Sequence, residues 1–187
     1  MSKYAQQLMG IIQGGRIESL RRKSALLSAK LDYDGFGIGG SFDKEDIGLS
    51  VRWVNEELTE AKPRHLLGIG EPNDLILAIE NGCDTFDCVA PTRMGRNGTL
   101  HTKCGRINIF NAKFQNDFEP IEKGCACYTC INYSRSYIAH LFRAKEMFAA
   151  TLASIHNLFF ISDLVARARQ SIFEDSFEKF KKQNLIK

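Results

Sequence analysis

The sequence has little of what marks a membrane protein or a strongly basic nucleic-acid-binding protein. Its formal net charge is only +3, so any RNA-binding surface must come from local basic clusters rather than from the overall field. No apolar run approaches a membrane span, and Met1-Ser2-Lys3-Tyr4 does not resemble the start of a signal peptide. Internal sequence repeats and low-complexity linkers are also missing. We therefore expect a soluble, cytoplasmic protein without a membrane partner.

The composition is that of a globular chain. Its 187 residues, 44% hydrophobic and 25% charged, are enough for a domain with its own core, and disorder is not indicated. Six cysteines would allow disulfides, but three of them crowd into residues 125–130. That spacing favours metal binding in a reducing compartment. Cys83, Cys88 and Cys104 are scattered, and we expect them to be small buried thiols.

Three thiols and one imidazole form a candidate metal site. Cys125, Cys127 and Cys130 together with His156 would complete the tetrahedral coordination of one Zn²⁺ ion and leave no position for a substrate. The set therefore predicts a structural ion. His140 is the alternative imidazole, but it follows Cys130 too closely if a helix begins near Ser134. The competing interpretation is a group of reduced thiols with His156 packed in a helix interface.

Short apolar runs that end in glycine or a turn alternate with helical patterns. The runs are residues 10–15, 36–40, 66–70 and 85–89. The helical patterns carry apolar stripes, the first with Ile17, Leu20, Leu26, Leu27 and Leu31, the second with Ile47, Leu49, Val51, Val54 and Leu58, and a shorter third over residues 74–79. This alternation predicts βα units and a parallel sheet. Small strands are expected within residues 98–114, and one long helical stretch is expected from Ser134 to Val165.

A carboxylate and two arginines near the fourth run are candidates for chemistry. Functional residues of parallel α/β folds collect where strands end, and Asp87 stands there in the place that glycine has in the other runs. Arg93 and Arg96 follow in a glycine-containing loop, and their guanidinium groups suit phosphates or base edges. A carboxylate beside such a loop is consistent with nucleophilic attack at a sugar carbon. The alternative is a capping or ion-paired structural carboxylate.

Gln13 is a candidate for base recognition. Its side chain has both a donor and an acceptor, as does the edge of a purine, and backbone groups near Gly39 and Gly40 would complete such recognition. The alternative is a turn residue that hydrogen-bonds its own loop.

Several motifs, in order along nearly the whole chain, resemble the tRNA-guanine transglycosylase (queuine tRNA-ribosyltransferase) family. They are Gly10-Ile-Ile-Gln13-Gly-Gly, Ile38-Gly39-Gly40, Phe86-Asp87-Cys88-Val89-x-Pro91-Thr92-Arg93-x-x-Arg96-Asn97-Gly98, Asn108-x-x-Asn111-Ala112-Lys113, the cysteine cluster, Asn132-Tyr133-Ser134-Arg135-x-Tyr137 and Ile155-His156-Asn157-Leu158. The family is a (β/α)₈ barrel with an inserted zinc subdomain. It replaces guanine at the wobble position of certain tRNA anticodons with a 7-deazaguanine base.

The resemblance implies a role for each matching residue. Asp87 would be the nucleophile that attacks the ribose anomeric carbon, and Gln13 and Gly40 would recognise the base. Positions that hold the tRNA anticodon loop would be Gly68, Ile69, Gly70, Glu71, Pro72, Asn73, Asp74, Thr92, Arg93, Met94, Gly95 and Arg96. The zinc ligands would be Cys125, Cys127, Cys130 and His156. Partial barrel units would occupy residues 1–97, and the zinc subdomain with the C-terminal helices would occupy residues 98–187.

The chain also departs from the family. It resembles only the second half, so the aspartates that act as general acid/base and grip the incoming base have no counterpart here. We therefore expect four βα units, which need a complementary N-terminal half, a homodimer partner or both. Residues 41–45 differ from the family's usual loop, which leaves open whether the inserted base is queuine, its bacterial precursor or an archaeal-type base. A non-catalytic, zinc-containing tRNA-binding or assembly subunit and an inactive truncated relic are the alternatives.

Overall fold

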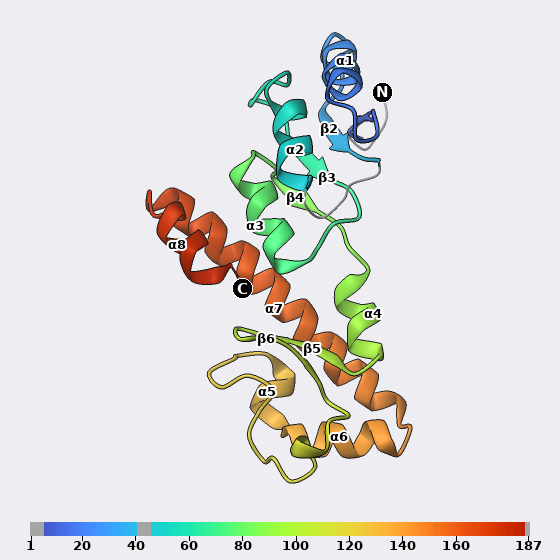
Figure 1. The fold of residues 1–187 in the computed structure, drawn as a ribbon, viewed down its shortest axis with the longest axis vertical. Helices are drawn as coiled ribbons and strands as arrows, with labels where there is room; N and C mark the ends of the chain where they lie inside the picture. The colour runs from blue at the N-terminus through green and yellow to red at the C-terminus, as the bar shows by residue number, and fades with distance from the viewer. Residues whose placement is uncertain (1–5, 41–45, 186–187) are drawn as a thin grey trace. The chain divides into compact units, whose positions relative to one another are not determined.

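The computed structural model describes residues 6–40 and 46–185 (Figure 1). The atypical loop over residues 41–45 lies outside the described residues. The chain divides after Cys88 into two compact units. This division comes earlier than the expected boundary after residue 97, because helix α4 (Ala90–Arg96) packs along helix α7 (Met147–Phe173) in the second unit.

The first unit is a parallel sheet whose strands alternate with helices, which confirms the predicted α/β class. The strands are β1 (Met9–Ile12), β2 (Gly35–Ile38), β3 (Arg64–Leu66) and β4 (Thr85–Phe86), in the spatial order β1-β2-β3-β4. The connecting helices are α1 (Glu18–Ala29), α2 (Ile47–Asn55) and α3 (Pro72–Glu80). The third strand lies earlier than expected: it ends at Leu66, and Gly68, with φ of +74°, turns the chain away.

The core of the first unit lies between the sheet and α2. Ile12, Phe36, Ile38 and Leu66 are buried in the sheet and belong to one cluster with Ile47, Val51 and Val54 of α2 and with Leu58, which follows that helix. The predicted apolar stripe of α2 is therefore confirmed, except for Leu49, which is 50% exposed.

The predicted stripe of the first helix is wrong as a core face. Its five apolar residues, Ile17, Leu20, Leu26, Leu27 and Leu31, are 47–55% exposed, whereas Arg21 and Ala25 are fully buried. The two buried residues are four apart, so they share the side of α1 that packs on this unit. Leu8 and Ile11, in and beside β1, are also exposed. Ile11 alternates with the buried Ile12 along β1, so its side chain lies on the other side of the sheet. We call the five residues of the first stripe, on and beside α1, the exposed apolar face.

Arg21 forms hydrogen bonds with the loops that follow β1 and β2. Its Nε donates to the carbonyl oxygen of Gly15 at 2.6 Å, and its NH1 group donates to the carbonyl oxygen of Gly39 at 3.2 Å. Burial lowers the pKa of this guanidinium. Charge-assisted bonds to backbone carbonyls compensate for part of that desolvation.

Replacing Arg21 with Met should therefore lower the free energy of unfolding of the first unit by about 3 kcal/mol, because both carbonyls lose a charged donor. Urea unfolding followed by circular dichroism would measure it. Arg22→Met is the matched control on the same helix, and its effect should be smaller. An equal loss in the two variants would contradict the role assigned to Arg21.

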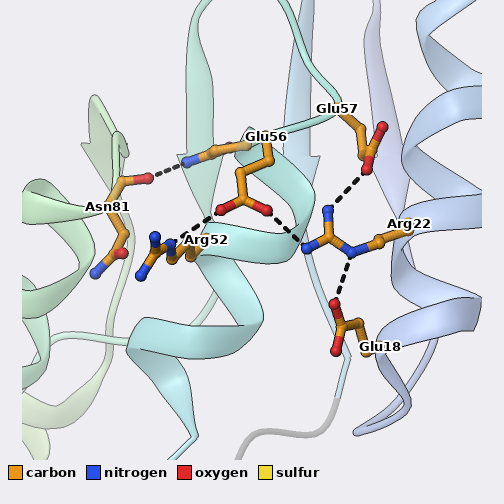
Figure 2. A network of polar contacts seen from close by, with 7 residues as sticks. Glu18, Arg22, Arg52, Glu56, Glu57 and Asn81 are labelled. Carbon is orange, nitrogen blue, oxygen red and sulfur yellow. Dashed lines mark hydrogen bonds and ion pairs between the residues drawn. The ribbon is translucent and has the colours of Figure 1, made fainter.

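Arg22 lies in an exposed network that joins α1 to α2 (Figure 2). Its three guanidinium nitrogens donate to Glu18 at 2.7 Å, Glu56 at 2.6 Å and Glu57 at 2.7 Å. These hydrogen bonds raise the pKa of Arg22, so the cation persists at any relevant pH. Because the network is exposed, salt screens it, and it contributes less than the buried contacts of Arg21.

The second unit is built around the long helix α7 (Figure 1). A hairpin of β5 (Thr99–Thr102) and β6 (Gly105–Asn108) confirms the small strands expected after residue 98. The other elements are the 3₁₀ turn η1 (Ala112–Phe114) and helices α5 (Tyr128–Asn132), α6 (Arg135–Arg143) and α8 (Phe177–Asn184). Helix α7 contacts α4, α5, α6, α8 and β5.

The long helical stretch expected from Ser134 is two helices. The hydroxyl of Ser134 caps α6 by accepting from the backbone N–H of Tyr137 at 3.2 Å. The helix ends at Arg143, where Lys145 adopts φ of +59° and Glu146 donates its N–H to the carbonyl oxygen of Leu141 at 3.0 Å. This left-handed cap explains the break, which the apolar pattern alone did not reveal.

Helix α7 has the length and apolar composition of a membrane span, contrary to the expectation that no segment would. Its 27 residues include a window with mean hydropathy of 1.4. It also buries His156 and Asn157, and Leu152 and Ala153 belong to the core of the second unit. These contacts are those of a core helix, so its composition is weak evidence for a membrane.

Candidate functional site

Asp87 lies one residue beyond β4 and is held there by neighbours from β3 and the loop after it. Its side chain is 60% exposed. Oδ1 accepts the backbone N–H of Gly68 at 3.0 Å and lies 3.1 Å from Nε2 of His65. The other ring nitrogen of His65, Nδ1, lies 2.8 Å from the hydroxyl of Thr85. The carboxylate is therefore oriented by hydrogen bonds while remaining open to a ligand.

The parallel register of the two strands produces this arrangement. His65 pairs with Thr85, and Asp87 is two residues beyond Thr85, so it projects from the same side of its strand. Gly68 supplies a positive φ of +74°, which strains any L side chain, and its N–H reaches the carboxylate. The turn and the register together bring the N–H of Gly68 and the imidazole of His65 within hydrogen-bonding distance of Oδ1 of Asp87.

These contacts favour the ionised form of Asp87. The N–H of Gly68, followed by the imidazole of His65, lowers the pKa of the Asp87 carboxyl below its ordinary value. Because the folded-state pKa is depressed, this interaction stabilises the fold above the unfolded-state pKa and is lost as the pH falls through the folded value. Near neutral pH the group is a carboxylate, the form that acts as a nucleophile.

Gln13 and Gly40 also lie close together. A methyl group on Gly40, whose φ is +103°, would lie 3.1 Å from Oε1 of Gln13, and one on Gly39 would lie 3.1 Å from Nε2 of Gln13. The backbone N–H of Gln13 donates to the hydroxyl of Ser24 at 3.1 Å. The amide side chain thus lies against two glycines, whose lack of a Cβ leaves room for it.

The two predicted tRNA-binding stretches belong to different units. Residues 68–74 form the turn after β3 and the first residues of α3, where Pro72 is the first helical position. Residues 92–96 lie in α4, which corrects the expectation of a loop: Pro91 near its start fixes φ, and the N–H of Arg93 donates to the carbonyl oxygen of Val89 at 2.9 Å. Arg93 and Arg96 are exposed and three apart, so they share one helical face.

The structure brings the four predicted metal ligands together. The ligand atoms of Cys125, Cys127, Cys130 and His156 all lie within 4.8 Å of one another. The three sulfur atoms are 4.0, 3.5 and 3.4 Å from Nδ1 of His156. Tetrahedral Zn–S and Zn–N bonds of usual length would separate sulfur and nitrogen by about 3.6 Å. The side chains therefore fit a tetrahedral cation.

Buried neighbours fix the imidazole in the orientation that a metal ligand needs. Nε2 of His156 is 2.8 Å from the carbonyl oxygen of His101, so Nε2 carries the hydrogen and the lone pair of Nδ1 faces the sulfurs. Next to it, Asn157 accepts the N–H of His101 at 3.0 Å and donates to the carbonyl oxygens of Pro91 at 3.0 Å and Thr99 at 2.9 Å. The cluster is thereby joined to the β5–β6 hairpin and to α4.

The thiols cannot all ionise without a cation. A hydrogen bond from the thiol of Cys130 lowers the pKa of Cys127 to about 4. The resulting thiolate raises the pKa of Cys130, while burial, more than the neighbouring thiolate, raises that of Cys125. A divalent cation would offset the repulsion between neighbouring thiolates and so bind all three sulfurs in their ionised form.

The remaining cysteines only partly match the expectation of burial. Cys83 is buried, and burial raises its pKa to about 12, but Cys88 is half-buried and Cys104 is exposed in the β5–β6 turn. Cys104 therefore lies outside both the core and the metal cluster.

Four residues of these sites received no role from the sequence: His65, Arg21, His101 and Asn157, the last of which was named only within a motif. His65 and Arg21 carried a signal, since each is a polar residue within a strand or a helix that packs on the core. The contacts of His101 and Asn157 join positions more than 50 apart and leave no local pattern.

Comparison with known proteins agrees with this geometry. The family model described as Queuine tRNA-ribosyltransferase matches residues 1–187. A queuine tRNA-ribosyltransferase of Thermoanaerobacter pseudethanolicus is 46% identical over 181 residues, which cover 95% of this chain and 48% of the relative. One of Streptococcus pyogenes serotype M5 is 45% identical over 185 residues, covering 97% and 49%. The chain thus spans about half the length of these relatives, and it belongs to the queuine tRNA-ribosyltransferase family.

Proposed function

We propose that this chain is the C-terminal portion of a tRNA-guanine transglycosylase and contributes the nucleophile, Asp87. The observation that carries the proposal is the oriented, ionised carboxylate beyond β4, in a chain that the family model matches throughout. The enzyme exchanges guanine at the wobble position of a tRNA for a 7-deazaguanine-type base.

The reaction has two displacements at C1′ of the ribose. An oxygen of Asp87 attacks C1′ while the bond from C1′ to the guanine nitrogen breaks, and guanine leaves with that electron pair and gains a proton. The ring nitrogen of the incoming base then attacks C1′, loses its proton, and releases the carboxylate. A general acid/base must move these protons, and we assign it to a complementary N-terminal half.

Binding of base and RNA is assigned to the residues that the sequence singled out. Gln13 and Gly40, which lie together, would recognise the base edge. The anticodon loop would contact residues 68–74 and 92–96, where the exposed Arg93 and Arg96 suit phosphate oxygens. A tRNA substrate agrees with the expected cytoplasmic location.

The need for a complementary half follows from the first unit. We infer that its four strands, with α1 to α3, belong to half of a (β/α)₈ barrel, and that the second unit contains the zinc subdomain. Within the described residues, β1 and β4 each pair on one side only, and the exposed apolar face lies on and beside α1. Unpaired strand edges and clustered apolar side chains favour association. The occupant we propose is the N-terminal half, while a homodimer is a further expectation.

We assign the metal as one Zn²⁺ with a structural role. Three sulfurs and one nitrogen at tetrahedral distances are the donor set that this ion prefers, and they leave no open position for a substrate. When bound, zinc supplies a rigid four-way cross-link between residues 125–130 and α7. His101 and Asn157 keep the ligands in place.

The exchange of labelled guanine into a cognate tRNA tests the proposed function. The purified chain should incorporate label only when a separately expressed N-terminal half is added. No exchange in either case, with zinc bound and tRNA retained in a salt-dependent manner, would instead favour the non-catalytic binding subunit. Exchange by the chain alone would contradict the assignment of the acid/base to the other half.

A further inference from the structure

We propose that His65 is a positioning residue for Asp87: together with the N–H of Gly68 it holds Oδ1, so that Oδ2 is presented as the attacking oxygen. This inference rests on the proposed function, because it assumes that Asp87 is the nucleophile. It adds to that function a second side chain, from a neighbouring strand, which fixes the orientation of the carboxylate.

The argument starts from which oxygen is held. The N–H of Gly68 at 3.0 Å and Nε2 of His65 at 3.1 Å both reach Oδ1. Oδ2 receives neither of these donors, and the side chain is 60% exposed. Two donors on one oxygen restrict rotation about the Cβ–Cγ bond, which would otherwise exchange the two oxygens. An oriented nucleophile loses less entropy on reaching the transition state.

The Asp87 carboxylate determines which nitrogen of His65 carries the hydrogen, because Oδ1, 3.1 Å from Nε2, can only accept. The hydroxyl of Thr85 lies 2.8 Å from Nδ1. In the neutral ring the hydrogen is therefore on Nε2, which donates to Asp87, and Nδ1 accepts from the hydroxyl of Thr85. The chain of donors therefore runs from Thr85 through His65 to Oδ1, and each polar atom in it has a partner.

The lowered pKa of Asp87 agrees with this orientation. Its causes are the Gly68 N–H and then the His65 imidazole, and the slight burial of the carboxyl acts in the opposite direction. From β3 the titratable group facing Asp87 is His65, and the loop contributes the backbone of Gly68. Loss of the His65 donor should raise the pKa only in part, since the Gly68 contact persists.

A matched pair of substitutions separates the donor from the ring. In His65→Gln the amide nitrogen occupies the place of Nε2, so a donor to Asp87 remains without the imidazole ring. In His65→Asn the amide reaches only the place of Nδ1, so the donor is lost. His65 is partly exposed, with 25% of its side chain accessible, and neither change should unfold the first unit.

The first readout is the pKa of Asp87 in the full chain, measured by carbon-detected NMR of the carboxyl group, with Asp87→Asn to assign its signal. We expect the pKa to rise in His65→Asn and to return toward the unsubstituted value in His65→Gln. An unchanged pKa in His65→Asn, or equal shifts in the two variants, would overturn the proposal.

The second readout is formation of the covalent tRNA adduct by the chain with its complementary half. His65→Asn should lower the rate constant about tenfold or more at an unchanged KM for tRNA, and His65→Gln should recover most of it. Equal rates in both variants and the unsubstituted chain would overturn the positioning role. If the unsubstituted pair forms no adduct, the proposed function fails instead, while the NMR result still decides whether His65 holds Asp87.

Discussion

Replacing Asp87 with asparagine should abolish the covalent tRNA adduct. The amide has nearly the shape of the carboxylate and its oxygen can still accept the Gly68 N–H, so the local fold should persist. It lacks the negative charge that makes the oxygen a nucleophile, and it cannot form the ester to C1′. We expect adduct formation to fall by at least about a thousandfold. The measurement is a denaturing gel of radiolabelled tRNA mixed with the chain and the complementary half.

Asp84→Asn is the matched control for that experiment. Asp84 is also on the chain segment around β4, where it accepts the N–H of Arg64 at 2.8 Å, and an asparagine oxygen can keep this contact. The control should form the adduct at a rate close to that of the unsubstituted chain. An adduct that persists in Asp87→Asn would show that another group attacks the sugar.

Loss of the metal should have the largest effect on stability. In Cys130→Ser the ion loses one of three thiolates, and the cross-link between residues 125–130 and α7 is weakened or lost. Because structural zinc contributes its binding free energy directly to folding, backbone amides from Cys125 to His156 should exchange with deuterium much faster than in the unsubstituted chain. A chelator added to the unsubstituted chain should reproduce the change.

Cys104→Ser is the control for the metal experiment, since Cys104 is exposed and lies outside the cluster. It should keep one equivalent of zinc and the protection of the second unit. Acid should release the ion, because the thiolate ligands gain protons as the pH falls. If the metal-free chain is equally protected, the closed structural site is wrong.

Much of the fold and both candidate sites were predictable because their signals are local. The metal cluster needs three cysteines within six residues and one histidine on a helix, and chain geometry favoured His156 over His140. The strands of the first unit are apolar runs that end where glycine or a turn changes the backbone direction. Asp87 was identifiable because it stands in the place that glycine has at the other strand ends.

What the sequence did not reveal depends on packing between distant segments. The leucines of α1 have the spacing of a core face, yet Arg21 and Ala25 are the residues of this helix that are buried against the unit. The core cluster of the first unit contains Ala25 and residues of the sheet and α2, but none of those leucines. The left-handed Lys145 that divides α6 from α7 has no glycine to mark it. The contact between His65 and Asp87 requires the parallel register of β3 and β4, which no local pattern specifies.

The exposed apolar face and the proposed chemistry are connected. If a second half covers the face and supplies the acid/base, the apolar side chains that are exposed in the isolated chain are those that bind its catalytic partner. Asp87 alone would then be an oriented nucleophile without a means to protonate the leaving guanine. Because the nucleophile and the acid/base would lie in different halves, we expect base exchange only when the second half is added.

Mapping the covalent adduct onto the chain tests the role of Asp87 most directly. Trypsin should cut after Arg64 and Arg93 and release residues 65–93, which contain Asp74, Asp84 and Asp87. After reaction with tRNA, the complementary half and nuclease digestion, mass spectrometry of this peptide should find the ribose remnant on Asp87. A remnant on another residue, or a fully active mixture in which this peptide is never modified, would contradict the nucleophilic role of Asp87.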